Sequence, residues 1–146
     1  MWKYFGGLLQ QLSMPDILDI GPATLEAVRP DLIVVRFKPG SIADPAAFAV
    51  SMNARKAHFA DTPHAVILVA PDDVDFDPSV LSRNHYKDQG VERFTLALAF
   101  VGRDPTVANI LELYYALHPA PFPVKFFTKE AEAFPWAEAQ VARRVA

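Results

Sequence analysis

The chain of 146 residues is long enough for one domain with a hydrophobic core and is short for two. Apolar residues make up 51% of it and charged residues 21%, a balance typical of a packed globular protein rather than a disordered one. Its net charge of -3 offers no electrostatic basis for binding nucleic acid, and the absence of cysteine excludes disulfides and thiolate chemistry.

Residues 1–20 are predicted to form an N-terminal arm that precedes a single domain at residues 21–146. The arm places Trp2, Phe5 and further apolar side chains at helical spacing, but two adjacent glycines weaken any helix there. Because the segment is too short and too polar for a signal sequence or a membrane span, we expect a cytoplasmic protein.

The domain begins with two strand-like segments, residues 24–29 and 32–38, and the Pro-Asp pair between them predicts a β-hairpin. Asp44 precedes a proline, an arrangement typical of a helix start, and predicts a helix that runs to residue 60. The apolar run at residues 64–70 then predicts a central strand that is buried on both faces.

The middle of the domain continues this alternation of helices and strands. A short helical segment is expected to open at Pro78 and to close at Gly90, and a second buried strand is expected at residues 94–102. Asp104, again followed by a proline, predicts a helix at residues 105–118 whose apolar residues have the spacing of a core-facing stripe.

The C-terminal part of the sequence predicts a last strand at residues 124–127 and a last helix capped by Thr128. Pro135 lies within this helix and predicts a kink or a break near residues 131–135. Trp136 is predicted to pack in the core or at an interface, as most buried aromatic side chains do.

The order of these elements predicts the fold class. Strands that alternate with helices need crossover connections, which place the strands parallel to one another with helices packed on the sheet. We therefore expect an α/β fold with a mixed, mostly parallel sheet of about five strands, an N-terminal β-hairpin and about four covering helices.

Two segments resemble the SpoIIAA-like (STAS-fold) family of small bacterial proteins. In FPVKFFTKEAEAFPWAEA a strand of the form P-V-x-x-F-T leads to an acidic residue, an Ala-rich turn and a Trp. In LALAFVGRDPTVANILELYYALHPAPFPV a strand is followed by a turn with proline, a helix with paired aromatic residues and a proline-bounded loop. The resemblance extends over residues 24–140, with its specific part at 94–137, and the chain departs from the family pattern at Pro135.

The resemblance implies an α/β layer fold that begins with a hairpin, and a non-enzymatic role as a regulatory or protein-interaction module. The likeness of the family to lipid-transfer domains implies an alternative role, as a carrier or sensor of a small apolar ligand. The apolar arm and the nearly all-apolar helix at residues 105–118 also predict a homodimer. Its predicted interface residues are Trp2, Phe5, Leu113 and Tyr115.

Candidate ligand residues follow the carboxyl ends of the predicted strands, where open α/β sheets bind their ligands. They are Asp72, Asp73, His85, Arg103, Asp104 and Lys129. Arg103 adjoins a helix start and could meet an anion there, but an ordinary surface charge is the favoured interpretation.

The acidic segment VDFDPSVLS is similar to the phosphorylation motif of switching members of the STAS superfamily, and this likeness implies a phosphosite at Ser79. A structural serine at a helix start is the alternative. Asp73, Asp75 and Asp77 repeat the opening of a calcium loop, but Pro78 stands where the loop needs glycine, so no metal site is predicted.

We predict neither catalytic residues nor a cofactor, because the histidines are scattered and the spacing shows no pair of nucleophile and base. Arg55 lies beside Phe48 and Phe59 on its predicted helix, an unusual neighbourhood for a charge. Snorkelling of the charged end to water explains this position without a ligand.

Overall fold

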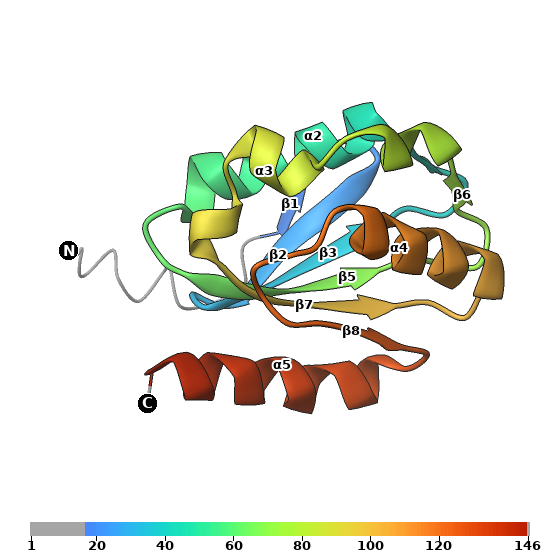
Figure 1. Ribbon diagram of the computed structural model, residues 1–146. Coiled ribbons are helices and arrows are strands. Elements are labelled where there is room, and N and C mark those ends of the chain that lie inside the picture. Colours follow the sequence, from blue (N-terminus) through green and yellow to red (C-terminus); the bar gives the residue numbers. More distant parts are fainter. Residues whose placement is uncertain (1–16, 146) are drawn as a thin grey trace.

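The computed structural model describes residues 17–145, which form a main sheet with helices on both of its faces and a second, two-stranded sheet (Figure 1). The elements, in chain order, are β1 Ile17–Asp19, β2 Ala23–Arg29, β3 Leu32–Phe37, β4 Ile42–Ala43, α2 Pro45–Phe59, β5 His64–Val69, β6 Asp75–Phe76, η1 Pro78–Ser82, α3 His85–Gln89, η2 Glu92–Phe94, β7 Thr95–Val101, α4 Pro105–Leu117, β8 Val124–Phe127 and α5 Glu130–Val145. None of the described helices is long and apolar enough to cross a membrane.

The main sheet has six strands in the order β1-β2-β3-β5-β7-β8. The first three strands are antiparallel neighbours, and β3, β5, β7 and β8 run parallel to one another. A separate two-stranded parallel sheet joins β4 to β6. The predicted fold class is confirmed, a mixed and mostly parallel sheet that begins with an antiparallel hairpin.

One strand of this sheet lies in the segment that was assigned to the N-terminal arm. Residues 17–19 form β1, which pairs with β2 so that Ile17 lies opposite Glu26. Three residues are too few to give a clear alternation of apolar and polar side chains, and the sequence therefore gave no signal for this strand. Residues 1–16, including Trp2 and Phe5, lie outside the described part of the chain.

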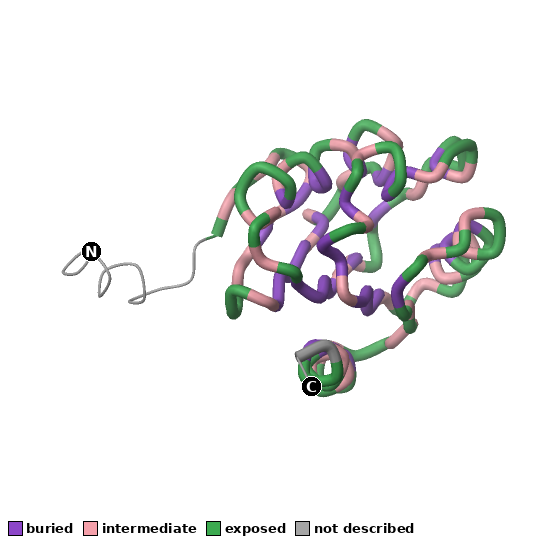
Figure 2. Tube along the Cα trace, turned by 60° about the vertical axis from the view of Figure 1, so that its left-hand side comes forward, coloured by how far each residue is buried: buried purple, intermediate pink, exposed green. Residues whose placement is uncertain are grey.

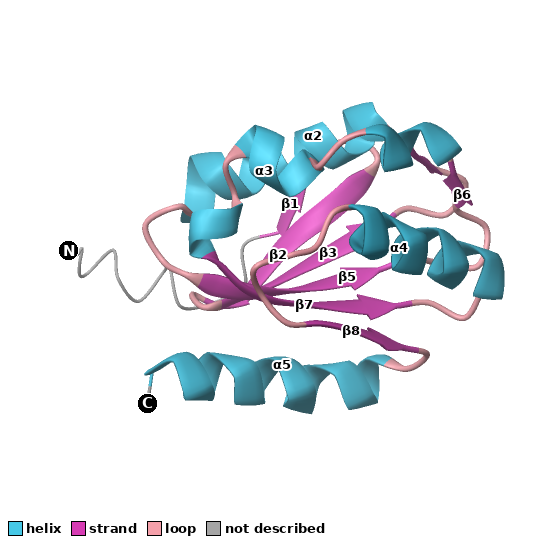
Figure 3. Cartoon of the chain, viewed as in Figure 1, coloured by secondary structure: helices cyan, strands magenta, loops and turns pink. Residues whose placement is uncertain are grey.

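The two faces of the sheet carry different cores. Among the described helices, α2, α3 and α4 cover one face and α5 covers the other (Figures 1 and 3). The core under α2, α3 and α4 contains large side chains such as Leu25, Phe100 and Tyr114, whereas the core under α5 contains many alanines. Buried positions follow the strands, and exposed positions lie on the outer turns of the helices (Figure 2). Small side chains allow α5 to approach the sheet closely.

Several predicted helix boundaries are confirmed by hydrogen bonds. The Asp44 carboxylate accepts from the backbone N–H of Ala47 at 2.8 Å, and the Asp104 carboxylate accepts from that of Thr106 at 2.9 Å. The helical segment after Pro78 is divided, because Asn84 caps a new helix, α3. Gly90 ends α3 in the left-handed conformation at φ 71°, which glycine adopts without steric cost.

Of the kink or break predicted near Pro135, the break is wrong, because α5 is continuous through that residue, and the kink stays a prediction. Proline removes the hydrogen bond to the carbonyl four residues earlier, that of Ala131. Both Pro135 and Ala131 are exposed, so that carbonyl can bind water instead. The helix begins at Glu130, and the Lys129 carbonyl accepts from Glu132 and Ala133, so the cap position is one residue after Thr128. Trp136 packs against Phe127.

Candidate functional site

The predicted crevice residues gather only in part. Arg103 forms a bidentate ion pair with Asp72, which joins the loops that follow β7 and β5. Asp104 is engaged as the cap of α4, and Asp73 and Lys129 are exposed. The ion pair occupies the guanidinium that was the candidate anion ligand, so this edge of the sheet carries a surface salt bridge.

His85 belongs to the core rather than to that edge. It is buried, its Nε2 lies 2.9 Å from the carbonyl oxygen of Val80, and its ring stacks on Tyr114. Burial lowers the pKa of His85, and the neutral ring is held beneath α4. We therefore assign His85 a structural role in this face of the sheet.

The acidic loop and the phosphosite candidate lie on the surface. Ser79 is exposed, and its backbone N–H donates to the Asp77 carboxylate at 3.0 Å, which caps η1. Among the described residues no group of three or more His, Asp or Glu side chains could hold a metal ion. Phosphorylation of Ser79 stays a prediction.

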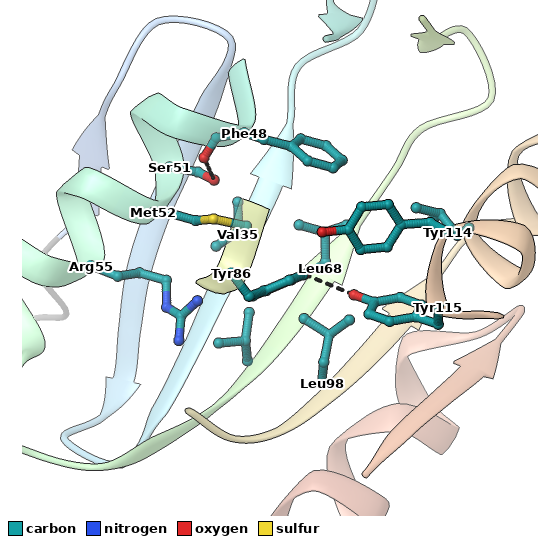
Figure 4. Close-up of a pocket in the computed structure, with 12 residues that line it drawn as sticks. Val35, Phe48, Ser51, Met52, Arg55, Leu68, Tyr86, Leu98, Tyr114 and Tyr115 are labelled. Atoms are coloured by element: carbon teal, nitrogen blue, oxygen red, sulfur yellow. Dashed lines mark hydrogen bonds between the residues drawn. The ribbon is translucent and has the colours of Figure 1, made fainter. Parts of the chain in front are cut away.

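A pocket that sequence reasoning did not find lies between α2, α3 and α4, above the sheet (Figure 4). It is partly open to solvent and leaves about 20 Å³ of free volume, enough for one water molecule or one small ion. Most of its lining is apolar or aromatic. The lining residues are Val35, Phe48, Ser51, Met52, Arg55, Val66, Leu68, Tyr86, Leu98, Leu111, Tyr114 and Tyr115.

Arg55 is the charged group of this pocket. The residue is 2% exposed and is the only buried Lys, Arg, Asp or Glu among the described residues. Its side chain extends from α2 into the space beside Tyr86 (Figure 4). The predicted snorkelling of Arg55 to water is wrong, because the sheet and the surrounding helices enclose the guanidinium.

Two neutral side chains hold the guanidinium in place. Its Nε donates to His64 Nε2 at 3.0 Å, and its Nη2 donates to Thr95 Oγ1. His64 Nδ1 lies 2.8 Å from the carbonyl oxygen of Thr62, so Nδ1 carries the ring proton and Nε2 is free to accept. Thr95 in turn donates to the carbonyl oxygen of Val91 at 2.7 Å. The cluster therefore orients Arg55 without neutralising its charge.

The electrostatics of the cluster reflect this uncompensated charge. Burial lowers the pKa of Arg55 to about 10, so the guanidinium is still protonated at neutral pH. Burial also lowers the pKa of His64 to about 4, and the charge of Arg55 contributes to that shift, so His64 is neutral. The ring of Phe94 lies under the guanidinium, with its centroid 5.7 Å from Cζ.

Tyrosine hydroxyls form the other polar part of the pocket. The hydroxyls of Tyr86 and Tyr115 lie 2.8 Å apart, and Tyr114 accepts from the backbone N–H of His85. Burial raises the pKa of Tyr86 and raises that of Tyr115 well above the usual value, so both are neutral. Tyr115, predicted at a dimer interface, thus faces the pocket, whereas Leu113 is 48% exposed.

The sequence offered a partial signal for this site. Arg55 stood out because its helical neighbours are aromatic, but His64, Thr95 and Tyr86 come from three other elements. Their convergence depends on the tertiary arrangement, which no spacing within a single segment encodes.

No curated protein and no solved structure matches this chain. The model of one family, described as a domain of unknown function, matches residues 28–140, from β2 through most of α5. The chain therefore belongs to that family, DUF7793.

Proposed function

We propose that this chain is a non-enzymatic binding module that takes up a small, mainly apolar ligand between α2, α3 and α4. The observation that carries the proposal is the partly open pocket over the centre of the sheet, lined by apolar and aromatic side chains. Ligand sites of proteins commonly combine such a lining with a few polar groups that fix orientation.

The position of Leu68 supports an entrance to this pocket. Leu68 lies on β5, between β3 and β7 in the sheet, where a side chain covered by helices would be fully buried. It is only partly buried, as is Tyr115 on the opposite wall. An organic molecule exceeds the free volume of about 20 Å³, so its entry requires the side chains of this wall to move apart.

Native mass spectrometry of freshly purified protein, together with calorimetric titration of octan-1-ol, tests the proposal. We expect either a retained small molecule or saturable binding of octan-1-ol. Leu68→Phe, which places a larger side chain in the entrance, should weaken that binding. Leu117→Phe, at an exposed position of α4, should leave it unchanged. If no molecule is retained and octan-1-ol does not bind, the proposal is wrong.

A second candidate function, protein interaction in a regulatory role, is favoured by a different surface. Leu113 and Leu117 lie one helical turn apart on α4 and are 48% and 56% exposed. Paired exposed leucines on a helix are a common feature of protein interfaces. The homodimer and the likeness to SpoIIAA-like regulators belong to this candidate, and both stay predictions.

A further inference from the structure

We infer that the pocket binds the carboxylate group of an amphiphilic ligand, and that Arg55 supplies the counter-charge. This inference rests on the proposed function, because it specifies the chemical class of the ligand that the pocket takes up. The ligand is a monocarboxylate with an apolar body, such as a medium-chain fatty acid. Its carboxylate lies at Arg55, and its body follows the apolar lining toward Leu68.

Arg55 has no counter-charge among the described residues. Transfer of an ionised group from water to a protein interior costs several kcal/mol unless an opposite charge compensates it. Both hydrogen-bond partners of Arg55 are neutral, and Nη1 has no hydrogen-bond partner in the part of the chain that the structure describes. The guanidinium can therefore donate further bonds, and Arg55 is one of the residues that line the pocket.

Three arginines that are partly or fully exposed differ from Arg55 in having a carboxylate partner. Arg29, Arg36 and Arg103 each lie within an ion-pair distance of a carboxylate on the surface, where the pairing has little effect on stability. Arg55, which needs a partner most, forms no ion pair with any described residue. An anion from outside the chain would therefore supply the negative charge that Arg55 lacks.

The chemistry of the pocket favours a carboxylate over other anions. The planar guanidinium matches the two oxygens of a carboxylate, and the free volume of about 20 Å³ accommodates such a group better than a phosphate. In the pair formed by Tyr86 and Tyr115, one hydroxyl accepts from the other and keeps its own proton. That proton is available for a second hydrogen bond to the ligand. The remaining lining is apolar, which suits a hydrocarbon body.

Calorimetric titration of the full chain with octanoate and with octan-1-ol tests this inference, because the two probes share an apolar body and differ in charge. An apolar surface without a cation would favour octan-1-ol, since burial of a carboxylate is unfavourable. We expect octanoate to bind about ten-fold more tightly or better, the range of a charge-assisted hydrogen bond. This comparison uses the wild-type chain and does not depend on the folding of a variant.

Two variants then locate the effect. Arg55→Met should abolish the preference for octanoate and leave the affinity for octan-1-ol unchanged. Arg93→Met is the matched control, because Arg93 lies over the same Phe94 ring, with Cζ 5.3 Å from its centroid, but on the exposed side. It should retain the preference. A wild-type chain that binds both probes equally, or an Arg55→Met variant that still prefers octanoate, would overturn the inference and leave the proposed function standing.

If neither eight-carbon probe binds, the proposed function is wrong. Thermal unfolding in the presence of formate then tests separately whether Arg55 binds an anion. Formate and formamide have similar size and differ in charge, and both are much smaller than the eight-carbon probes. We expect formate to raise the midpoint of thermal unfolding above the value in formamide, for wild type and Arg93→Met but not for Arg55→Met. Equal midpoints in the wild-type protein would show that Arg55 binds no anion.

Discussion

At the scale of single residues, His64 is the group whose protonation state depends most on the fold. Its Nε2 accepts from Arg55, and its Nδ1 donates to the carbonyl of Thr62, so the folded ring has no position for a second proton. A proton on Nε2 would break the bond to Arg55 and place two positive charges side by side. Burial and this neighbour together explain why the pKa falls to about 4.

This lowered pKa predicts a pH-dependent stability. Between about pH 4 and 6.5 the unfolded chain binds the His64 proton and the folded chain does not, so the free energy of unfolding falls as the pH falls. The full contribution is about 3 kcal/mol, present above pH 6.5 and lost near pH 4. Urea unfolding of the wild type and of His64→Gln across this range measures it. The variant should show a flatter profile, and parallel profiles would contradict the assignment.

At the scale of elements, α5 is set apart by the small residues beneath it. Ala133 and Ala137 are fully buried and form one cluster with Ala65, Ala97 and Ala99 of the sheet. At these positions the helix and the sheet meet through methyl groups. The helix therefore depends on tight packing rather than on a large apolar area.

A pair of substitutions on α5 tests this description. Ala137→Leu should reduce the free energy of unfolding by about 1–3 kcal/mol, because the added methylenes force the helix away from the sheet. Ala139→Leu, on the exposed side of the same helix, should change it by less than about 0.5 kcal/mol. Chemical unfolding of both variants gives the comparison. Equal effects would show that α5 is loosely attached.

The elements also show what sequence patterns can and cannot predict. Asp44 and Asp104, each before a proline, fixed two helix starts because capping is a local interaction. The break predicted at Pro135 does not occur, because the effect of a proline depends on whether the carbonyl four residues earlier, here that of Ala131, can bind water. That exposure is a property of the tertiary structure. The site around Arg55 also depends on tertiary structure. The helical spacing marks Arg55 as an unusual charge, but only the assembled sheet brings His64 and Thr95 to it.

At the scale of the whole molecule, we predict that the chain associates with a second copy through the exposed leucines on the outer face of α4. Its exposed residues Leu113 and Leu117 are not among the residues that line the pocket, whereas Leu111 and Tyr114 of the same helix are. Ligand binding and dimer formation would therefore use different residues of one helix.

Light scattering coupled to gel filtration at micromolar concentration tests the dimer. The wild type should have the mass of two chains, and a variant with Leu113→Glu and Leu117→Glu should have the mass of one, because charges at an apolar interface are unfavourable. Ile42→Glu, at a leucine-sized residue that is 55% exposed on β4, is the control and should remain dimeric. A wild-type chain that elutes as a monomer would remove this prediction.

The position of α5 in the chain affects how the protein is synthesised. α5 follows every strand in the sequence and is the only described helix on its face of the sheet, so the ribosome releases it after the strands that it covers. Until residues 130–145 have emerged, the apolar strip of the sheet that includes Val34, Ile67 and Val101 lacks its covering helix. Exposed apolar sheet surface promotes aggregation. We therefore expect the nascent chain to be most prone to aggregation in the interval before α5 emerges.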